Sequence, residues 1–87
     1  MTVKIAIIDD HDIIRLGIKS VLEKIADYEV CAEGQDGEEA LKIAQDLSPD
    51  IMLLDITMPK LGGLDVISRI KRASPKTRII IISVHKL

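Results

Sequence analysis

The sequence predicts a doubly wound α/β fold, in which helices cover both faces of a parallel sheet. Apolar runs of strand length alternate along the 87 residues with segments whose apolar side chains recur at helical spacing. Two of these runs, residues 51–54 and 79–82, are continuously apolar, which is typical of parallel strands buried on both faces. The resulting order β-α-β-α-β-α-β requires right-handed crossovers between parallel strands.

The first strand and the first helix are predicted on either side of a cluster of acids. Residues 3–8 are mainly β-branched and predict a strand that ends in an Asp-Asp-His-Asp sequence at residues 9–12. Residues 13–26 predict a helix, with Asp12 placed to cap its start. Gly17 inside this helix costs about 1 kcal/mol relative to alanine, and close packing of the helix on the sheet is the expected compensation. The apolar stripe of the helix consists of Ile14, Ile18, Val21, Leu22 and Ile25.

The middle of the chain is expected to add a strand and a second helix. Residues 29–33 predict a strand weaker than the first, and Cys31 within it is interpreted as a small core residue. The helix is expected to open at Asp36 or Gly37 and to end at a Ser-Pro-Asp sequence at residues 48–50. Its apolar positions are Ala40, Leu41, Ile43, Ala44 and Leu47.

The last two predicted strands lie on either side of a third helix. Residues 51–55 form the strand around which the chain is organised, because four apolar residues lead directly into the carboxylate of Asp55. Residues 64–73 predict a helix that ends at a Ser-Pro-Lys-Thr sequence. Residues 78–84 predict the fourth strand, with Ser83 at its carboxyl end.

Composition restricts the class of protein. Tyr28 is the single aromatic residue, so the core must be aliphatic. The net charge of -2 gives no general affinity for nucleic acid, and the basic residues from Lys60 onward are interpreted as a solvated helix face. A single cysteine excludes an intrachain disulfide and fits a reducing compartment. Because no signal peptide or membrane-length apolar run is present, we expect a cytoplasmic chain that has no contact with a membrane.

Carboxylates follow two strands that a doubly wound sheet makes neighbours. Asp9 and Asp10 close the first strand and Asp55 closes the third, so we expect all three at one edge of the sheet, where such folds bind ligands. Like charges held together repel, and a hard divalent cation relieves the repulsion. Mg²⁺ takes oxygen ligands and keeps several waters, so two carboxylates and a carbonyl suffice. Taken singly, each aspartate could instead cap a helix or open a turn.

Three sequence motifs lie at the ends of predicted strands. They are Ile-Ile-Asp-Asp-His-Asp at residues 7–12, Leu-Leu-Asp-Ile-Thr-Met-Pro at residues 53–59 together with Gly63, and Ile-Ile-Ser at residues 81–83. These motifs resemble those of response regulator receiver domains. Asp-Asp-His, an Arg-Leu-Gly step at residues 15–17 and Glu-Gly at residues 33–34 resemble, more narrowly, receivers of LuxR-type transcription factors. The resemblance extends from Val3 onward and implies a flavodoxin-like sheet with strand order 2-1-3-4.

The resemblance implies a role for each residue at the edge of the sheet. Asp55 would be the phospho-acceptor, which takes a phosphoryl group from a sensor histidine kinase. Asp10, Asp55 and the backbone carbonyl of Thr57 would ligate Mg²⁺ or Mn²⁺, and Asp9 would act through a metal-bound water. Ser83 would be the switch hydroxyl that hydrogen-bonds a phosphoryl oxygen. The receiver would be an acceptor in a phosphorelay and not an enzyme.

The sequence departs from the receiver pattern after its fourth strand. A complete receiver continues with a fourth helix, a fifth strand that ends in an essential lysine, and a fifth helix, and LuxR-type regulators then add a domain that binds DNA. Residues 1–87 are therefore interpreted as a partial receiver domain, in which Lys86 lies in the wrong element to replace that lysine. The fourth strand would be a raw edge, through which we expect the chain to self-associate.

Other functions stay open at this point. The chain could be an inactive fragment that serves only as a folding or assembly module. A small Mg²⁺-dependent phosphatase would share the strand-end acids, but the sequence offers it neither a phosphate-binding lysine nor a general acid. His11 could act as a base, although no nucleophile is paired with it by spacing, so a polar loop residue beside the site is the favoured interpretation.

Overall fold

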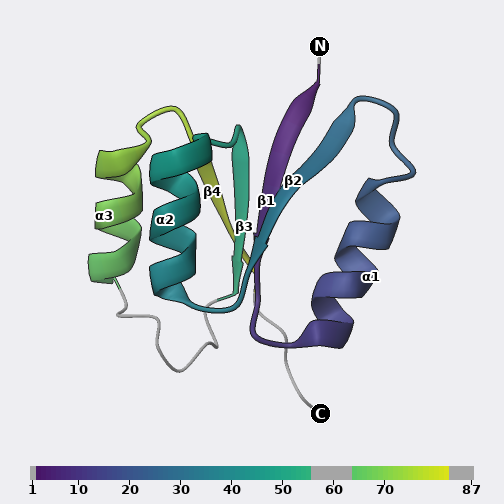
Figure 1. The fold of residues 1–87 in the computed structure, drawn as a ribbon, viewed down its shortest axis with the longest axis horizontal. Coiled ribbons are helices and arrows are strands. Elements are labelled where there is room, and N and C mark those ends of the chain that lie inside the picture. Colours follow the sequence, from purple (N-terminus) through teal and green to yellow (C-terminus); the bar gives the residue numbers. More distant parts are fainter. Residues whose placement is uncertain (1, 56–63, 83–87) are drawn as a thin grey trace.

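The computed structural model of the chain describes residues 2–55 and 64–82, which form three layers (Figure 1). Helices and strands alternate as β1 (Val3–Ile8), α1 (Asp12–Leu22), β2 (Tyr28–Gly34), α2 (Gly37–Leu47), β3 (Ile51–Asp55), α3 (Leu64–Ala73) and β4 (Arg78–Ile82). Neighbouring strands are parallel, and their order is β2-β1-β3-β4. The predicted fold class and strand order are confirmed.

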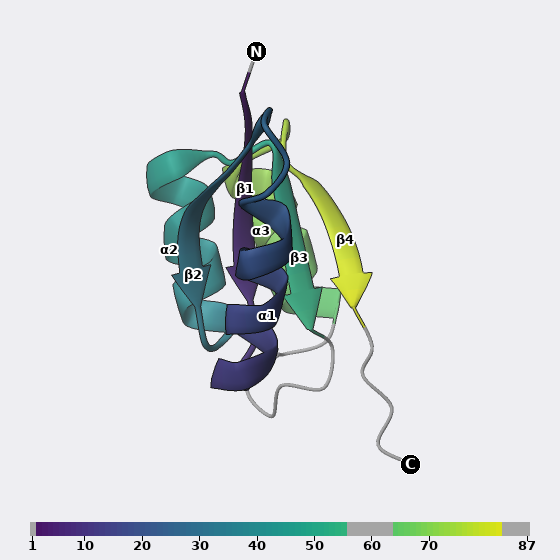
Figure 2. The same ribbon diagram turned by 90° about the vertical axis from the view of Figure 1, so that its right-hand side faces the viewer.

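The helices are divided unequally between the two faces of the sheet. In Figure 1, α2 and α3 lie side by side on one face, and α1 lies on the other. Figure 2 shows α1 in front of β1 and β2, the strands that it contacts, while β4 lies to one side of it. Among the described elements, α1 therefore covers only the β1–β2 half of its face.

The hydrophobic core lies between the sheet and the α2–α3 layer. Small side chains on α2 let this helix approach the strands closely, and aliphatic side chains from β1, β3 and α3 fill the remaining space. Its fully buried members are Ala6, Ile8, Ala40, Ala44, Met52, Leu54 and Ile70. Because Ile8 is the register partner of Leu54, this core holds the carboxyl ends of β1 and β3 next to each other.

Some element boundaries differ from the prediction. α1 ends at Leu22 and not at residue 26, because the amides of Lys24 and Ile25 bond carbonyls three residues back and the chain then turns into β2. β2 is one residue longer at each end than the predicted 29–33. β4 is described as far as Ile82, so the rest of its predicted range lies outside the described residues.

The prediction that two strands are buried on both faces is wrong. In β3, Met52 and Leu54 are buried on the α2–α3 side, but the alternate residues Ile51 and Leu53 are only half-buried. The edge strand β4 exposes 48% of Ile80 and 44% of Ile81. For Leu53 and its register partner Ile80, the reason is that α1 leaves its face over β3 and β4 open. Ile81 is the register partner of Leu54 and lies on the α2–α3 face, so its exposure reflects the position of β4 at the edge of the described sheet. Of the residues predicted in the apolar helix stripes, Val21, Ile25 and Leu47 are exposed.

Two further predictions about α1 are also wrong. The N-cap residue is His11, without a side-chain capping bond, and Asp12 is instead the first residue of the helix. The carboxylate of Asp12 accepts a hydrogen bond from the Arg15 guanidinium. A Cβ at Gly17 would meet nothing within 4 Å, so close packing on the sheet does not explain this glycine.

Candidate metal centre

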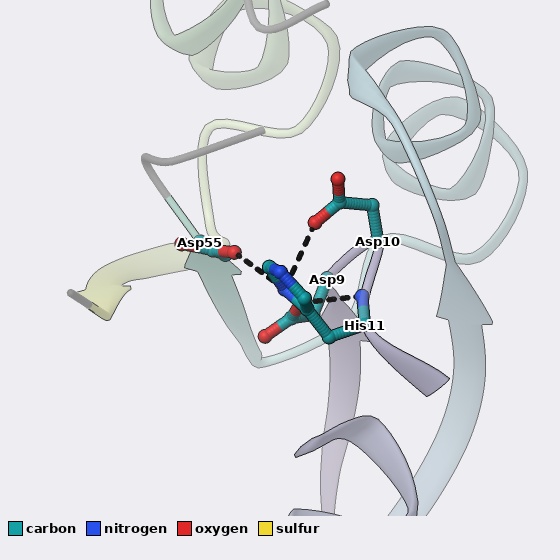
Figure 3. A group of neighbouring side chains, drawn as sticks. All are labelled: Asp9, Asp10, His11 and Asp55. Carbon is teal, nitrogen blue, oxygen red and sulfur yellow. Dashed lines mark hydrogen bonds and ion pairs between the residues drawn. The ribbon is translucent and has the colours of Figure 1, made fainter. Parts of the chain in front are cut away.

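Four ionisable side chains converge where β1 and β3 end (Figure 3). Asp9 and Asp10 follow β1, His11 precedes α1, and Asp55 is the last residue of β3. Each side chain offers one ligand atom, and the four atoms lie within 4.8 Å of one another. The structure thus brings the three predicted aspartates together, while the roles assigned to them stay predictions.

The backbone around Asp9 is held by several hydrogen bonds. Its amide donates to the carbonyl of Gly34 at 3.0 Å, which extends the pairing of β1 with β2 by one residue. Its Oδ1 accepts from both the backbone amide and Nδ1 of His11, at 2.8 Å each. Nη1 of Arg15 donates to the backbone carbonyl oxygen of Asp9 at 2.6 Å. The turn between β1 and α1 is therefore fixed from three directions.

The second carboxylate oxygen of Asp9 is buried without a hydrogen-bond partner among the described residues. Only 1% of Asp9 is exposed, so bulk water does not satisfy this oxygen either. Leaving a buried acceptor unsatisfied costs about 1–3 kcal/mol, and more for a charged group. A cation, or a water bound to one, would remove that cost.

His11 lies deeper in this cluster than a polar loop residue beside the site would. Its Nδ1 lies 2.8 Å from Oδ1 of Asp9, 3.0 Å from Oδ1 of Asp10 and 3.7 Å from Oδ2 of Asp55. The hydrogen bond to Asp9 raises the pKa of His11 above its usual value, and the nearby carboxylate charges add to this against the opposing effect of burial. The sequence feature that could have indicated this contact is the position of His11 directly after two strand-end aspartates.

Arg15 connects the site to the neighbouring strand, and sequence reasoning did not assign it a role. Besides the Asp9 carbonyl, its guanidinium contacts Glu33 at 3.2 Å and Asp12 at 2.6 Å. Lys19, one turn further along α1, also contacts Glu33 at 3.2 Å. These ion pairs attach α1 to the end of β2.

The remaining predicted site residues lie outside the described residues. They are Thr57, with its carbonyl ligand, and Ser83, the switch hydroxyl. Pro59, Gly63 and Lys86 lie outside as well.

The donor set fits a divalent cation. Asp9, Asp10 and Asp55 supply carboxylate oxygens, the ligands that Mg²⁺ and Mn²⁺ prefer. Asp55 and Asp9 are buried, whereas one third of the Asp10 side chain is exposed, so the cluster is open to solvent on the Asp10 side. An ion that bonds the second carboxylate oxygen of Asp9 would also satisfy that buried atom.

A doubly wound parallel sheet with carboxylates at the carboxyl ends of two adjacent strands defines a class of α/β proteins that bind ligands at that edge. Within this class, the chain belongs to the response regulator receiver domain family, whose pattern matches residues 5–87.

Curated relatives agree with this assignment. The chain is 36% identical over 83 residues to the transcriptional regulatory protein DegU of Brevibacillus brevis, covering 95% of this chain and 35% of that protein. It is 37% identical over 82 residues to the response regulator GacA of Pseudomonas syringae pv. syringae, covering 94% of this chain and 38% of that protein. The chain thus spans well under half the length of these relatives.

Solved structures show the same fold. A LuxR-family two-component response regulator from Aurantimonas sp. SI85-9A1 superimposes with a TM-score of 0.87 at 34% identity, over 99% of this chain and 61% of that one. RcsB from Salmonella enterica serovar Typhimurium, bound to the promoter rprA in the presence of the phosphomimetic BeF3-, gives a TM-score of 0.86 at 28% identity. That match covers 99% of this chain and 44% of RcsB.

Proposed function

We propose that this chain is the phosphoryl-accepting region of a two-component response regulator, with Asp55 as the acceptor. The observation that carries the proposal is the position of Asp55, fully buried at the end of β3 and clustered with Asp9 and Asp10. Membership of the receiver family supplies the reaction class. The partner would be a sensor histidine kinase.

The chemistry is a nucleophilic displacement at phosphorus. A carboxylate oxygen of Asp55 attacks the phosphorus of a phosphohistidine, and a P–O bond forms as the P–N bond breaks in line with it. The leaving imidazole nitrogen of the kinase takes the electron pair. Asp10, Asp55 and the Thr57 carbonyl would hold Mg²⁺ directly, and Asp9 would act through a metal-bound water. When bound, the ion neutralises charge on the transferring oxygens.

The partners of the whole protein follow from its relatives as proposals. RcsB was solved bound to a promoter, so we propose that the protein regulates transcription and that DNA is bound by a domain C-terminal to this one. Among the described helices, none is long and apolar enough to cross a membrane. The cytoplasmic location, and the interpretation of residues 1–87 as one part of a receiver domain, stay predictions.

Phosphorylation is tested with acetyl phosphate and Mg²⁺, followed by intact mass. In the full-length protein, we expect one acid-labile phosphoryl adduct, which Asp55→Asn abolishes. Asp50→Asn is the matched control, because Asp50 lies just before the opposite end of β3 and accepts a hydrogen bond from the Lys4 amide. An adduct that survives in Asp55→Asn would refute the acceptor assignment.

The 87-residue chain by itself is expected to form little adduct. None of its residues matches the family's essential lysine, and losing one preorganised donor at a developing charge commonly costs ~10²–10³ in rate. Rapid, stoichiometric phosphorylation of the 87-residue chain would show that the lysine is dispensable.

The metal site is tested separately from phosphorylation. Mn²⁺ should bind weakly among the three aspartates, because they and the Thr57 carbonyl fill only part of an octahedral shell. Asp10→Asn should lose most of this affinity, measured by the relaxation enhancement of water protons. Unchanged Mn²⁺ affinity in this variant would exclude the site as described.

We also propose that the 87-residue chain self-associates through β4. This would be its function if it serves as an assembly module and not as a phosphoryl acceptor. β4 lies at the edge of the described sheet and exposes Ile80 and Ile81, and an apolar edge strand is a template for pairing with a second copy. Replacing Ile80 and Ile82 with lysine should block the pairing, while Ser68→Lys on α3 is the control for added charge. Sedimentation equilibrium that shows a well-folded monomer at high micromolar concentration contradicts this proposal.

A further inference from the structure

The imidazole of His11 occupies the space between the carboxylates. Figure 3 shows its ring among Asp9, Asp10 and Asp55, with dashed contacts that run to all three. Ligands that bond one ion at about 2.0–2.2 Å lie about 3.0–3.5 Å from one another. The separations of Nδ1 from the three oxygens, 2.8, 3.0 and 3.7 Å, straddle that range. His11 is therefore placed both to exclude an ion and to become one of its ligands.

We propose that His11 decides which class of divalent ion this site holds. The inference rests on the metal site of the proposed function and adds a nitrogen ligand to it. A hard ion such as Mg²⁺ prefers oxygen ligands, so the imidazole must leave the cluster before this ion can bind. A borderline ion such as Ni²⁺ binds imidazole well, so Nδ1 stays and ligates it beside the carboxylates.

The surroundings of His11 allow both arrangements. Its side chain is 39% exposed, so the ring can turn toward solvent without displacing buried groups. Its backbone amide donates to the same Asp9 oxygen at 2.8 Å, and this bond is kept when the ring turns. Arg15 fixes the Asp9 carbonyl, so the ring can move while the carboxylates stay in place.

A second observation supports a cation at this cluster. His11 engages Oδ1 of Asp9, whereas Oδ2 of the same carboxylate is buried without a partner among the described residues. The imidazole alone thus leaves the cluster incompletely satisfied. An ion that binds the second oxygen would satisfy it, with His11 displaced or with His11 as a ligand.

The proposal predicts opposite changes in affinity when the imidazole is removed. Mg²⁺ no longer competes with the hydrogen bonds of Nδ1 and should bind on the order of threefold to tenfold more tightly. Ni²⁺ loses a ligand and should bind on the order of 10- to 100-fold more weakly, since outer-shell losses alone cost that much. A purely structural role of His11 would move both affinities in the same direction.

The experiment is a titration of the 87-residue chain with Mg²⁺ and with Ni²⁺, by calorimetry at one pH and ionic strength. His11→Ala removes the side chain, and His11→Gln keeps a polar group without an imidazole. His85→Ala is the matched control, because it removes the other histidine of the chain. Circular dichroism checks that each variant is folded, and the ¹⁵N shift of Nδ1 reports coordination directly.

The expected result is that both His11 variants bind Mg²⁺ more tightly and Ni²⁺ more weakly than the unaltered chain, while His85→Ala changes neither affinity. Parallel changes for the two ions, no change, or a loss of Ni²⁺ binding in His85→Ala would overturn the proposal. If the unaltered chain binds neither ion, or if Asp10→Asn binds Mg²⁺ as well as the unaltered chain does, the metal site of the proposed function fails as well.

Discussion

The two faces of the sheet are covered by different means. On the α2–α3 face, side chains of β1 and β3 meet small and aliphatic residues and are excluded from solvent. On the α1 face, no residue of the helix is fully buried, and Ile13 is 85% exposed. Ile14, Ile18 and Leu22 of α1 are half-buried. Arg15 and Lys19 add ion pairs to Glu33.

This difference teaches where rigidity and access come from in the candidate site. Asp55 and Asp9 extend strands whose α2–α3 faces are closely packed, so their carboxylates are fixed in position. His11 and Asp10 lie on the turn into α1, the less buried helix, and their side chains remain partly exposed. The site therefore combines two buried carboxylates, which are fixed in position, with two side chains that solvent can reach.

The largest expected effect comes from truncating the core on the packed face. Ile70→Ala removes a fully buried side chain of α3 and should cost about 2–5 kcal/mol in the free energy of unfolding. Leu16→Ala on the opposite face removes an exposed side chain and should change it by less than about 0.5 kcal/mol. Urea denaturation of both variants measures the contrast. Equal losses would show that α1 contributes apolar packing comparable to that of α3.

Two glycines allow the same substitution on both faces. At Gly34, a new Cβ would lie 3.0 Å from Cδ1 of Ile8 and 3.2 Å from Cβ of Glu39, so alanine is overpacked there. Gly34→Ala should destabilise the protein by about 1–3 kcal/mol. At Gly17 the space is open, so alanine should stabilise α1 by roughly 1 kcal/mol. Thermal unfolding of the two variants should shift in opposite directions, and a destabilised Gly17→Ala would mean that α1 packs more closely than described.

The sequence was sufficient for the fold because its periodicity is unambiguous. The continuous apolar run before Asp55 and the helical stripe of α2 predicted their elements, and the crossover rule then placed β1 beside β3. Exposure could not be predicted in the same way. Ile80 and Leu53 have the composition of doubly buried strand residues, but their burial depends on which helices cover that face. Periodicity carries no information about such a partner.

The candidate site was predictable only in its carboxylates. Strand-end position alone brought Asp9, Asp10 and Asp55 together, because parallel strands end at one edge. The part played by His11 and Arg15 depends on side-chain direction within a short turn. No periodicity describes that turn, so their contacts emerge only from the structure.

The third prediction tests the polar attachment of α1. Arg15→Ala removes hydrogen bonds to the Asp9 carbonyl, Asp12 and Glu33 and should cost about 1–3 kcal/mol, because the donor is charged and mostly buried. Lys19→Ala removes one half-exposed ion pair to the same Glu33 and should cost less than about 1 kcal/mol. Hydrogen exchange should also accelerate at the His11 amide in Arg15→Ala alone. If both variants lose the same stability, Glu33 and not the Asp9 carbonyl is the important contact of Arg15.

The smallest expected effect is a pH dependence of the free energy of unfolding, which arises from His11 on the accessible side of the site. In metal-free protein, Asp9, Asp10 and Asp55 face His11, and Arg15 binds the Asp9 carbonyl. The hydrogen bond to Asp9 raises the folded-state pKa of His11 above its unfolded value of about 6.5. The stabilising contribution of charged His11 is therefore complete below that unfolded value and is lost as pH rises through the higher folded pKa.

This prediction is measured by comparing the unaltered chain with His11→Gln in the presence of a chelator. The difference in the free energy of unfolding should favour the unaltered chain at acid pH and should narrow as the pH rises above about 6.5. Ile70→Ala, whose effect is apolar, should show no such pH dependence and serves as the control from the packed face. A difference that widens with rising pH would mean that His11 is held neutral in the folded protein. Its contact with Asp9 would then be an ordinary hydrogen bond and not an ion pair.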